Sequence, residues 1–343
     1  MLRNLSRFAT VMFSVAVMFC ACNVLKQFSE DTTAKKLEKT ENVKGYLFVH
    51  FRGERRNEYE QIFFSISRDG LKWNTVNQGK SVLQSELGER GVRDPFIIRN
   101  PVTDKIYIIA TDLCIGLNGN WGRAQSSGSK AIIIWESDDM VNWSAPRRVE
   151  IASEDAGCTW APEAFWDAEK EEFFVFWASM TTRNGQRKQR VFSSRTKDFV
   201  TFTPAKLYIE KSNHIIDSTI VKENGRYYRF SKDESVKAII METSDSLEGT
   251  WIAVSGFPHI TGYEGPECFR LNDGTNRWCL LLDFYSRGQG YQPFFTDDLA
   301  SGNFKAANGM LKFPYRFRHG SIIPLTETEY NSIIRKWGMS EDD

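Results

Sequence analysis

The sequence predicts an all-β fold, a five-bladed β-propeller whose closing blade is built from both ends of the propeller domain. Three observations support this prediction. The 343-residue chain is rich in aromatic residues, 13% with 10 Trp and 25 Phe, and aromatic side chains favour half-buried pleated surfaces. A turn of Ser or Thr and Asp, followed by an aromatic residue, recurs five times. Strand-like runs precede each copy, as expected for blades of four strands.

The start of the chain predicts an export signal and a tether. Two arginines precede an uncharged apolar run over residues 8–22, which has signal-peptide length and is short for a membrane span. The run ends in FCAC, which resembles a bacterial lipoprotein cleavage site except that Phe stands where Leu is more usual. We interpret residues 1–22 as a signal peptide with a lipoprotein cysteine, Cys22, and residues 23–44 as a flexible linker. An ordinary secretory signal is the alternative.

The turn pattern divides residues 45–326 into units of similar length. The five copies end in the aromatic residues Trp73, Trp143, Phe202, Trp251 and Phe304. These lie about 50 to 70 residues apart, a period typical of one propeller blade with variable loops. The even spacing favours a propeller over a β-sandwich in which the turns recur by chance.

The two ends of this domain predict how the ring closes. Only two strand-like runs, residues 46–51 and 61–66, stand before the first copy of the turn. One more run, residues 319–324, follows the fifth copy. Pairing the last run with the first sheet completes a blade and removes an exposed sheet edge. Residues 327–343 are interpreted as a C-terminal tail.

Charge and composition exclude several kinds of partner. The 44 Lys and Arg balance 44 Asp and Glu, whereas nucleic acids and anionic membranes attract proteins with a basic excess. We therefore expect no nucleic-acid partner, and membrane contact only through a lipid anchor. The expected location is the periplasm, the outer membrane or the cell surface, and the expected oligomeric state is a monomer.

Acidic residues stand where the innermost strands of four blades begin, and a propeller brings those positions together around its axis. They are Asp94 before Pro95, Glu163 after Trp160-Ala161-Pro162, Asp217 after Ile216, and Glu264 before Gly265-Pro266. Converging carboxylates repel one another, so such a set indicates a metal or a reaction. A turn-capping role is the alternative for any one of them.

Glycoside hydrolysis uses several carboxylates and needs no Ser/His or Cys/His pair. One carboxylic acid protonates the leaving oxygen, while another carboxylate activates water or attacks the sugar. A third carboxylate raises the pKa of the acid by like-charge repulsion. Trp160, Trp166 and Tyr263 stand near the acids in the sequence, and we expect them to offer ring faces to a sugar.

From about residue 45 to 324 the chain resembles glycoside hydrolase family 43, five-bladed propeller enzymes that act on arabinose- and xylose-containing glycans. The Asp-Pro motif implies that Asp94 is the general base. The Ile-Asp motif implies that Asp217 modulates the pKa of the acid, and the Glu-Gly-Pro motif implies that Glu264 is the general acid. The Trp-Ala-Pro-acid motif is matched with Glu163 where many members have Asp, and we assign Trp160 and Glu163 to substrate binding.

The resemblance implies further properties. It implies an inverting mechanism, with the carboxyl groups of Asp94 and Glu264 about 6.5–9.5 Å apart. It also implies a calcium ion at the propeller axis, held mainly through waters with His319 as a near neighbour; a buried structural histidine is the alternative. Arg287 is assigned to sugar hydroxyls. The expected function is an exported, exo-acting glycosidase that releases arabinofuranosyl, or xylosyl, residues from plant-type oligo- and polysaccharides.

Two departures from the family pattern and two alternative functions remain open. Ser218 stands where proline is common, and Glu267 competes with Glu264 for the acid role, although strand alternation allows only one of them to face the axis. A fructan hydrolase of the same fold is favoured by Arg-Asp-Pro at residues 93–95 and Glu-Cys at residues 267–268, but its Asn-Asp-Pro-Asn motif is missing. The other alternative is a non-catalytic glycan-binding propeller.

Overall fold

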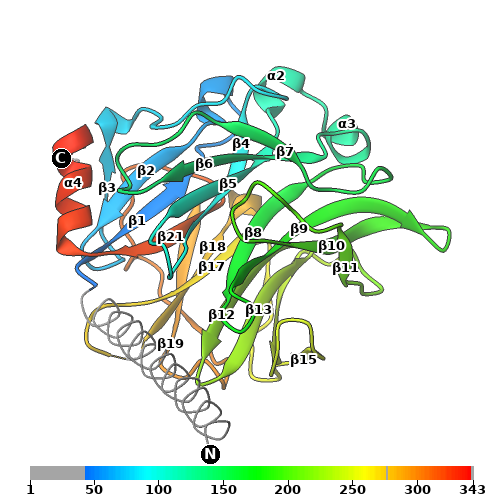
Figure 1. Cartoon of the computed structure of the whole chain (residues 1–343). Coiled ribbons are helices and arrows are strands. Elements are labelled where there is room, and N and C mark those ends of the chain that lie inside the picture. Colours follow the sequence, from blue (N-terminus) through cyan, green and yellow to red (C-terminus); the bar gives the residue numbers. More distant parts are fainter. Residues whose placement is uncertain (1–42, 276, 341–343) are drawn as a thin grey trace, which may run out of the picture. The chain divides into compact units, whose positions relative to one another are not determined.

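The structure is a computed structural model, and it describes residues 43–275 and 277–340. The segment interpreted as a signal peptide, and nearly all of the linker, lie outside these described residues. Five antiparallel sheets make up residues 44–340 (Figure 1). In this part of the chain no helix is long and apolar enough to cross a membrane.

Four of the sheets follow one another along the chain, each with its strands in sequence order. The first contains β4 (Val92–Arg99), β5 (Ile106–Asp112), β6 (Ala131–Ser137) and β7 (Arg147–Glu150). The second contains β8 (Trp160–Asp167), β9 (Glu172–Arg183), β10 (Gln186–Thr196) and β11 (Lys206–Ile209). The third contains β12 (Ile215–Glu223), β13 (Arg226–Asp233), β14 (Ala238–Ser244) and β15 (Ile252–Ala253), with β16 (Ile260–Thr261) also paired to β14. The fourth contains β17 (Glu264–Arg270), β18 (Trp278–Asp283), β19 (Tyr291–Thr296) and β20 (Lys305–Ala306).

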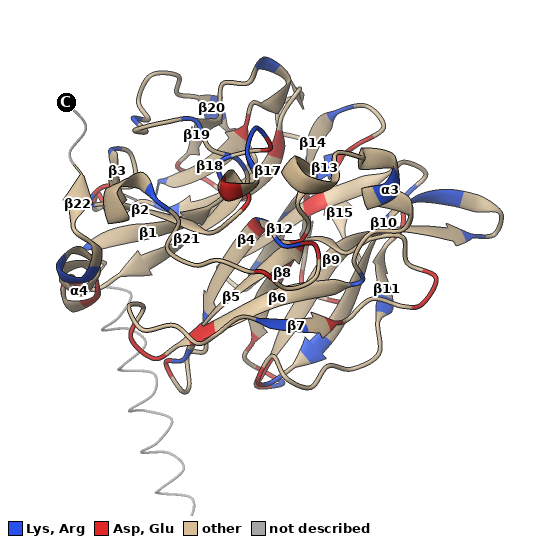
Figure 2. Cartoon of the chain, turned by 90° about the horizontal axis from the view of Figure 1, so that it is seen from above, with Lys and Arg blue, Asp and Glu red and all other residues tan. Residues whose placement is uncertain are grey.

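The fifth sheet joins the two ends of the domain and confirms the predicted closure. Its order is β21 (Gly320–Leu325), β1 (Gly45–His50), β2 (Phe63–Ser67), β3 (Trp73–Val76) and β22 (Met339–Ser340). Strands β1 and β21 are antiparallel along their whole length, from Gly45 opposite Leu325 to His50 opposite Gly320. The first strands of the five sheets form a closed ring of contacts, in the order β21, β4, β8, β12 and β17 (Figure 2).

Residues 327–340 of the segment set apart as a C-terminal tail belong to the closing blade. Helix α4 (Glu327–Trp337) begins at a capping box of Thr326 and Glu329, which satisfies backbone N–H groups of its first turn. Its buried residues Tyr330 and Ile333 join the apolar cluster that also contains β1 and β21. Strand β22 then pairs with β3.

The recurring turn has the same backbone hydrogen bonds to its Asp in four of its five copies, which explains its sequence pattern. In the first copy the Asp69 carboxylate accepts from the backbone N–H groups of Leu71 and Lys72, both at 2.8 Å. The indole N–H of Trp73 donates to the carbonyl of Gly70. Asp139, Asp198 and Asp298 accept in the same way from the second and third residues after them. In these four copies the Asp therefore fixes the turn.

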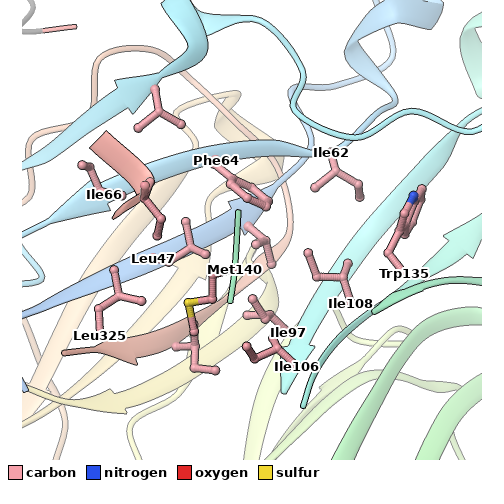
Figure 3. Close-up of a cluster of buried hydrophobic side chains, with 14 of the residues drawn as sticks. Leu47, Ile62, Phe64, Ile66, Ile97, Ile106, Ile108, Trp135, Met140 and Leu325 are labelled. Carbon is pink, nitrogen blue, oxygen red and sulfur yellow. The ribbon is translucent and has the colours of Figure 1, made fainter. Parts of the chain in front are cut away.

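Apolar side chains fill the spaces between neighbouring sheets. The cluster between the closing sheet and the β4 sheet brings Leu47 and Phe64 against Ile108 and Trp135 (Figure 3). Similar clusters join the β4 sheet to the β8 sheet, the β8 sheet to the β12 sheet, and the β12 sheet to the β17 sheet. This packing holds the inner strands in fixed positions around the axis.

Four inner strands begin with the same β-bulge. Asp94, Ala161, Asp217 and Gly265 have left-handed backbone conformations, with φ of +47°, +45°, +45° and +55°. Beside each of them the pairing with the second strand shifts by one residue, as a bulge requires. Proline follows in three strands and Ser218 in the fourth, so the departure at Ser218 leaves this local geometry intact.

Candidate active site

Asp94 lies on the bulge of β4 with two polar partners. Its Oδ2 accepts a hydrogen bond from Thr111 Oγ1 at 2.9 Å, and its Oδ1 lies 3.4 Å from His319 Nδ1. Burial raises the pKa of Asp94, but the hydrogen bond and charge of His319, with the charge of Arg93, lower it below the usual range. Asp94 is therefore a carboxylate, the form that a general base requires.

Asp217 occupies the equivalent bulge in β12 and reaches the strand of the next blade. Its Oδ2 accepts a hydrogen bond from the backbone N–H of Gly265 at 3.2 Å. Burial, with the charges of Glu264 and Asp94, raises the pKa of Asp217 to about 6, against the opposing effect of His319 and Lys232. Asp217 thus lies near enough to both Asp94 and Glu264 for their charges to act on it.

Glu264 is held by two cations that the sequence analysis did not identify. Lys232 Nζ lies 2.7 Å from its Oε2, and Arg318 Nη2 donates to its Oε1. Burial raises the pKa of Glu264, but Lys232 and Arg318 lower it below the usual range. The sequence predicted the opposite direction, a pKa raised by Asp217, because it gave no sign that both cations reach this carboxylate.

Arg318 connects the acid to two more carboxylates. Its guanidinium lies 2.6 Å from Asp283 Oδ2 and 2.9 Å from Glu54 Oε1, besides its bond to Glu264. Glu54 in turn pairs with Arg93 at 2.8 Å. Burial raises the pKa of Asp283 to about 6, although the charge of Arg318 opposes this. The site is therefore a continuous network of opposite charges.

Pairing between the first and second strands of a blade accounts for most of the site residues that the sequence analysis missed. The second strand of each blade ends beside the start of the first strand. The last polar residues of the second strand therefore lie at the same end of the propeller axis as the acids. Thr111 lies opposite Arg93, Lys232 opposite Ile216, and Asp283 opposite Glu264. The sequence signal is a polar residue at the end of a second strand, such as Lys232 in the run Ser231-Lys232-Asp233.

Glu163 and Glu267 lie deeper in the axis. Each stands two residues after its left-handed residue, in β8 and β17, and both are buried. Glu267 accepts from the backbone N–H of Ile322 at 2.9 Å, and burial raises its pKa to about 8. Burial and the charge of Glu267 raise the pKa of Glu163 well above its usual range. The carboxyl of Glu163 is thus enclosed in protein, whereas its predicted role was contact with substrate.

The predicted sugar-facing aromatic residues lie in different places. Trp160 is partly exposed, and its ring meets that of Trp121 edge-on, with centroids 6.0 Å apart. Trp166 packs on Phe173 at the other end of β8, in the core between two sheets, so this expectation is wrong. Tyr263 stacks on Phe284, with centroids 4.0 Å apart.

Arg287 lies in the loop after β18, in the short 3-10 turn η3 (Tyr285–Arg287). The ring of Tyr285 is covered by Lys232 Nζ at 4.2 Å from its centroid, so the start of this turn borders the charge network. The side chain of Arg287 is exposed to solvent. Its assignment to sugar hydroxyls stays a prediction.

The residues around His319 do not fit a directly coordinated metal. Within residues 43–275 and 277–340, no group of three or more His, Cys, Asp and Glu side chains is arranged to hold an ion. Burial lowers the pKa of His319, but Asp94, Asp217 and Glu163 raise it to about 9. A pKa this high places positive charge on His319 among the acids, which offsets part of their mutual repulsion.

A calcium ion held through waters stays a prediction, and chelation tests it. Elemental analysis of the purified protein is expected to find about one calcium per chain, and a strong chelator is expected to lower activity until calcium is added back. Protein that contains no calcium and keeps full activity in chelator would contradict the prediction.

The sequence identifies the family of this five-bladed propeller, whose acids stand at the starts of its inner strands. Residues 41–331 match the family model of a probable glycosyl hydrolase domain related to glycosyl hydrolase family 43. The chain belongs to this family.

One curated relative and two solved structures are similar to this chain. An alpha-L-arabinofuranosidase of Bifidobacterium longum subsp. longum is 31% identical over 313 residues, which cover 78% of this chain and 29% of that protein. The chain thus spans less than a third of that relative. An exo-beta-1,3-galactanase of Phanerochaete chrysosporium, solved with beta-1,3-galactotriose, has a TM-score of 0.55 and 14% identity over 77% of this chain and 60% of its own. A putative exo-beta-1,3-galactanase of Bifidobacterium bifidum s17 has a TM-score of 0.52 and 13% identity over 79% of this chain and 90% of its own. The two structures have the same fold as this chain.

Proposed function

We propose that this protein is an exo-acting, inverting glycosidase that releases α-L-arabinofuranosyl residues from plant-type glycans. The observation that carries the proposal is the 31% identity to an alpha-L-arabinofuranosidase over 78% of this chain. The ionised Asp94 and the neighbouring Asp217 and Glu264 supply the carboxylates that the reaction needs. Release of xylosyl residues is the nearest variant of this activity.

In this mechanism Asp94 and Glu264 act on opposite sides of the anomeric carbon. The Asp94 carboxylate takes a proton from water, and the water oxygen bonds to the anomeric carbon. The bond from that carbon to the glycosidic oxygen breaks, and protonated Glu264 gives its proton to the leaving oxygen. Asp217 accepts a hydrogen bond from the backbone N–H of Gly265, the residue after Glu264, and so positions the strand that carries the acid. The sugar leaves with inverted configuration, which NMR of the first product detects.

The acid role requires Glu264 to be protonated, while Lys232 and Arg318 favour its ionised form. The alkaline limb of kcat/KM is therefore expected at low pH. In Lys232→Met one of these cations is lost, so the pKa of Glu264 rises and the alkaline limb moves to higher pH by about one unit. The pH profile of kcat/KM on an aryl arabinofuranoside measures this shift.

The control for this prediction is Lys105→Met, because Lys105 lies in the turn between β4 and β5 and its ion pairs are with Glu136 and Asp138, at 3.3 and 3.4 Å, not with Asp94, Asp217 or Glu264. Its pH profile should match that of the parent enzyme. If the alkaline limb of Lys232→Met stays in place or moves toward acid, Glu264 is not the acid that sets it.

Exo-beta-1,3-galactanase activity is a second candidate, favoured by the fold shared with two such proteins. A panel of nitrophenyl α-L-arabinofuranoside, β-D-xyloside and β-D-galactoside, with arabinan, xylan and β-1,3-galactan, separates the candidates. The proposal is supported if sugar is released fastest from the arabinofuranosides. The second candidate is supported if sugar is released fastest from galactan. Binding of a glycan without any release would overturn both and favour a glycan-binding propeller.

We also propose that the protein is exported and lipidated at Cys22, because a basic start and an apolar run precede the FCAC segment. Metabolic labelling with a radioactive fatty acid is expected to mark the wild-type chain and not Cys22→Ser. An unlabelled wild-type chain in the culture medium would instead indicate an ordinary secretory signal.

A further inference from the structure

Trp121 is an exposed aromatic residue that borders the charge network and has no role in the mechanism above. It begins the short helix α3 (Trp121–Ser126) in the segment between β5 and β6, and 48% of its surface is exposed. The Arg93 guanidinium lies over its ring, 5.0 Å from the centroid. Its other ring neighbour is Trp160, which meets it at 85°. Arg93 directly precedes the proposed base, Asp94, so Trp121 borders the candidate active site.

A buried carboxylate holds the N-terminal part of the segment that carries Trp121. Glu60 is fully buried, and its oxygens accept from the backbone N–H groups of Ile115 at 2.9 Å and Gly116 at 2.6 Å. The same carboxylate pairs with Arg93 at 3.0 Å. Burying a charge is costly unless it is paired and hydrogen-bonded. Here the charge links the segment to the residue beside Asp94.

The C-terminal part of the segment is held by a separate set of hydrogen bonds, which do not involve Glu60. Arg123 donates two hydrogen bonds of 2.7 Å to Glu89. Asn120 caps α3 by accepting from the backbone N–H of Arg123, and the N–H of Gly128 donates to the carbonyl of Gly157 in the connection between β7 and β8. A surface tryptophan is thus held rigidly before any ligand arrives, which lowers the ordering cost of binding.

We propose that Trp121 is the platform of an outer subsite, which binds a neutral sugar unit of the glycan beyond the residue that is hydrolysed. An exposed indole offers a broad apolar face for the C–H face of a sugar ring and an N–H group for a hydroxyl. Arg93 is paired with Glu54 and Glu60, so the platform recognises its ligand through the ring and not through charge. This inference rests on the proposed function and deepens it: for an exo-acting enzyme, the further sugar belongs to the leaving group.

Binding to a catalytically inactive variant tests the subsite without turnover. In the Asp94→Asn background, calorimetry measures the Kd for arabinotetraose, xylotetraose and β-1,3-galactotriose. Adding Trp121→Ala should raise the Kd of the oligosaccharide that binds by about tenfold, a loss of about 1.4 kcal/mol. Trp121→Phe keeps an aromatic face and should recover most of the affinity. The matched control is Leu117→Ala, because Leu117 is 41% exposed in the neighbouring helix α2 (Ile115–Asn118) and is not part of the platform.

A kinetic comparison in the active enzyme separates this inference from the proposed function. Trp121→Ala should lower kcat/KM on an oligosaccharide about tenfold more than on the nitrophenyl glycoside of the same sugar, because the nitrophenyl substrate has no second sugar. Equal Kd values with and without Trp121→Ala, or oligosaccharide binding by none of the three probes, would overturn the subsite. If the active enzyme still hydrolysed a nitrophenyl glycoside in those cases, only the subsite would be rejected. If it hydrolysed none, the proposed function would be rejected as well.

Discussion

Asp94→Asn should lower kcat on natural glycans and on activated aryl glycosides alike, by about 10²- to 10⁴-fold. Asn cannot take the proton of the attacking water, and no leaving group, however good, replaces that activation. Asn keeps the size of Asp and can still accept the hydrogen bond that Thr111 Oγ1 donates. Initial rates on arabinan and on nitrophenyl arabinofuranoside measure the effect.

The control for this variant is Asp138→Asn, because Asp138 is an exposed acid in the turn that follows β6. It should have the activity of the parent enzyme. Thermal unfolding shows whether Asp94→Asn is folded. A folded Asp94→Asn protein that retains most of its activity on either substrate would remove Asp94 from the role of base.

Glu264→Gln should separate two kinds of substrate. Natural glycosides have poor leaving groups that need a proton, so their kcat should fall by about 10²- to 10⁴-fold. Aryl glycosides with acidic phenols leave without much protonation and should lose far less. The ratio of kcat on arabinan oligosaccharides to kcat on a dinitrophenyl glycoside is the measurement.

Glu267→Gln is the matched comparison for this prediction. Glu267 is buried in the axis and accepts from the N–H of Ile322, so we expect its loss to affect both substrates equally, through stability. If Glu267→Gln instead produces the selective loss on natural substrates, the acid role belongs to Glu267. Equal losses on both substrates in Glu264→Gln would also contradict the scheme.

The fold was predictable because its signals are local. In four of the five turns the Asp accepts from N–H groups two and three residues away, as Asp69 does, so a short pattern marks the end of the third strand of a blade. The closure by β1 and β21 followed from counting strands at the two ends of the domain. The acids at the axis followed from their places at the starts of strands.

The electrostatics of the site could not be predicted in the same way, because they depend on pairing between strands. A bulge shifts the register by one residue, which decides whether Lys232 or its neighbour lies opposite Ile216. The contact of Arg318 with Glu264 joins residues 54 apart in the sequence. Trp166 was misplaced because a motif at the start of a strand does not say at which end or on which face of the strand a later side chain lies.

Closure of the ring by β21 has a consequence for how activity arises during folding. Arg318 and His319 directly precede β21 and supply partners to Glu264 and Asp94. The four other blades can be synthesised, and their acids can approach one another, before this last inner strand exists. Without these cations the acids repel one another, so the last strand also neutralises the centre. Catalytic competence is therefore a late event, acquired in the same step that locks the two ends of the domain together, and activity can serve as a reporter of a completed ring.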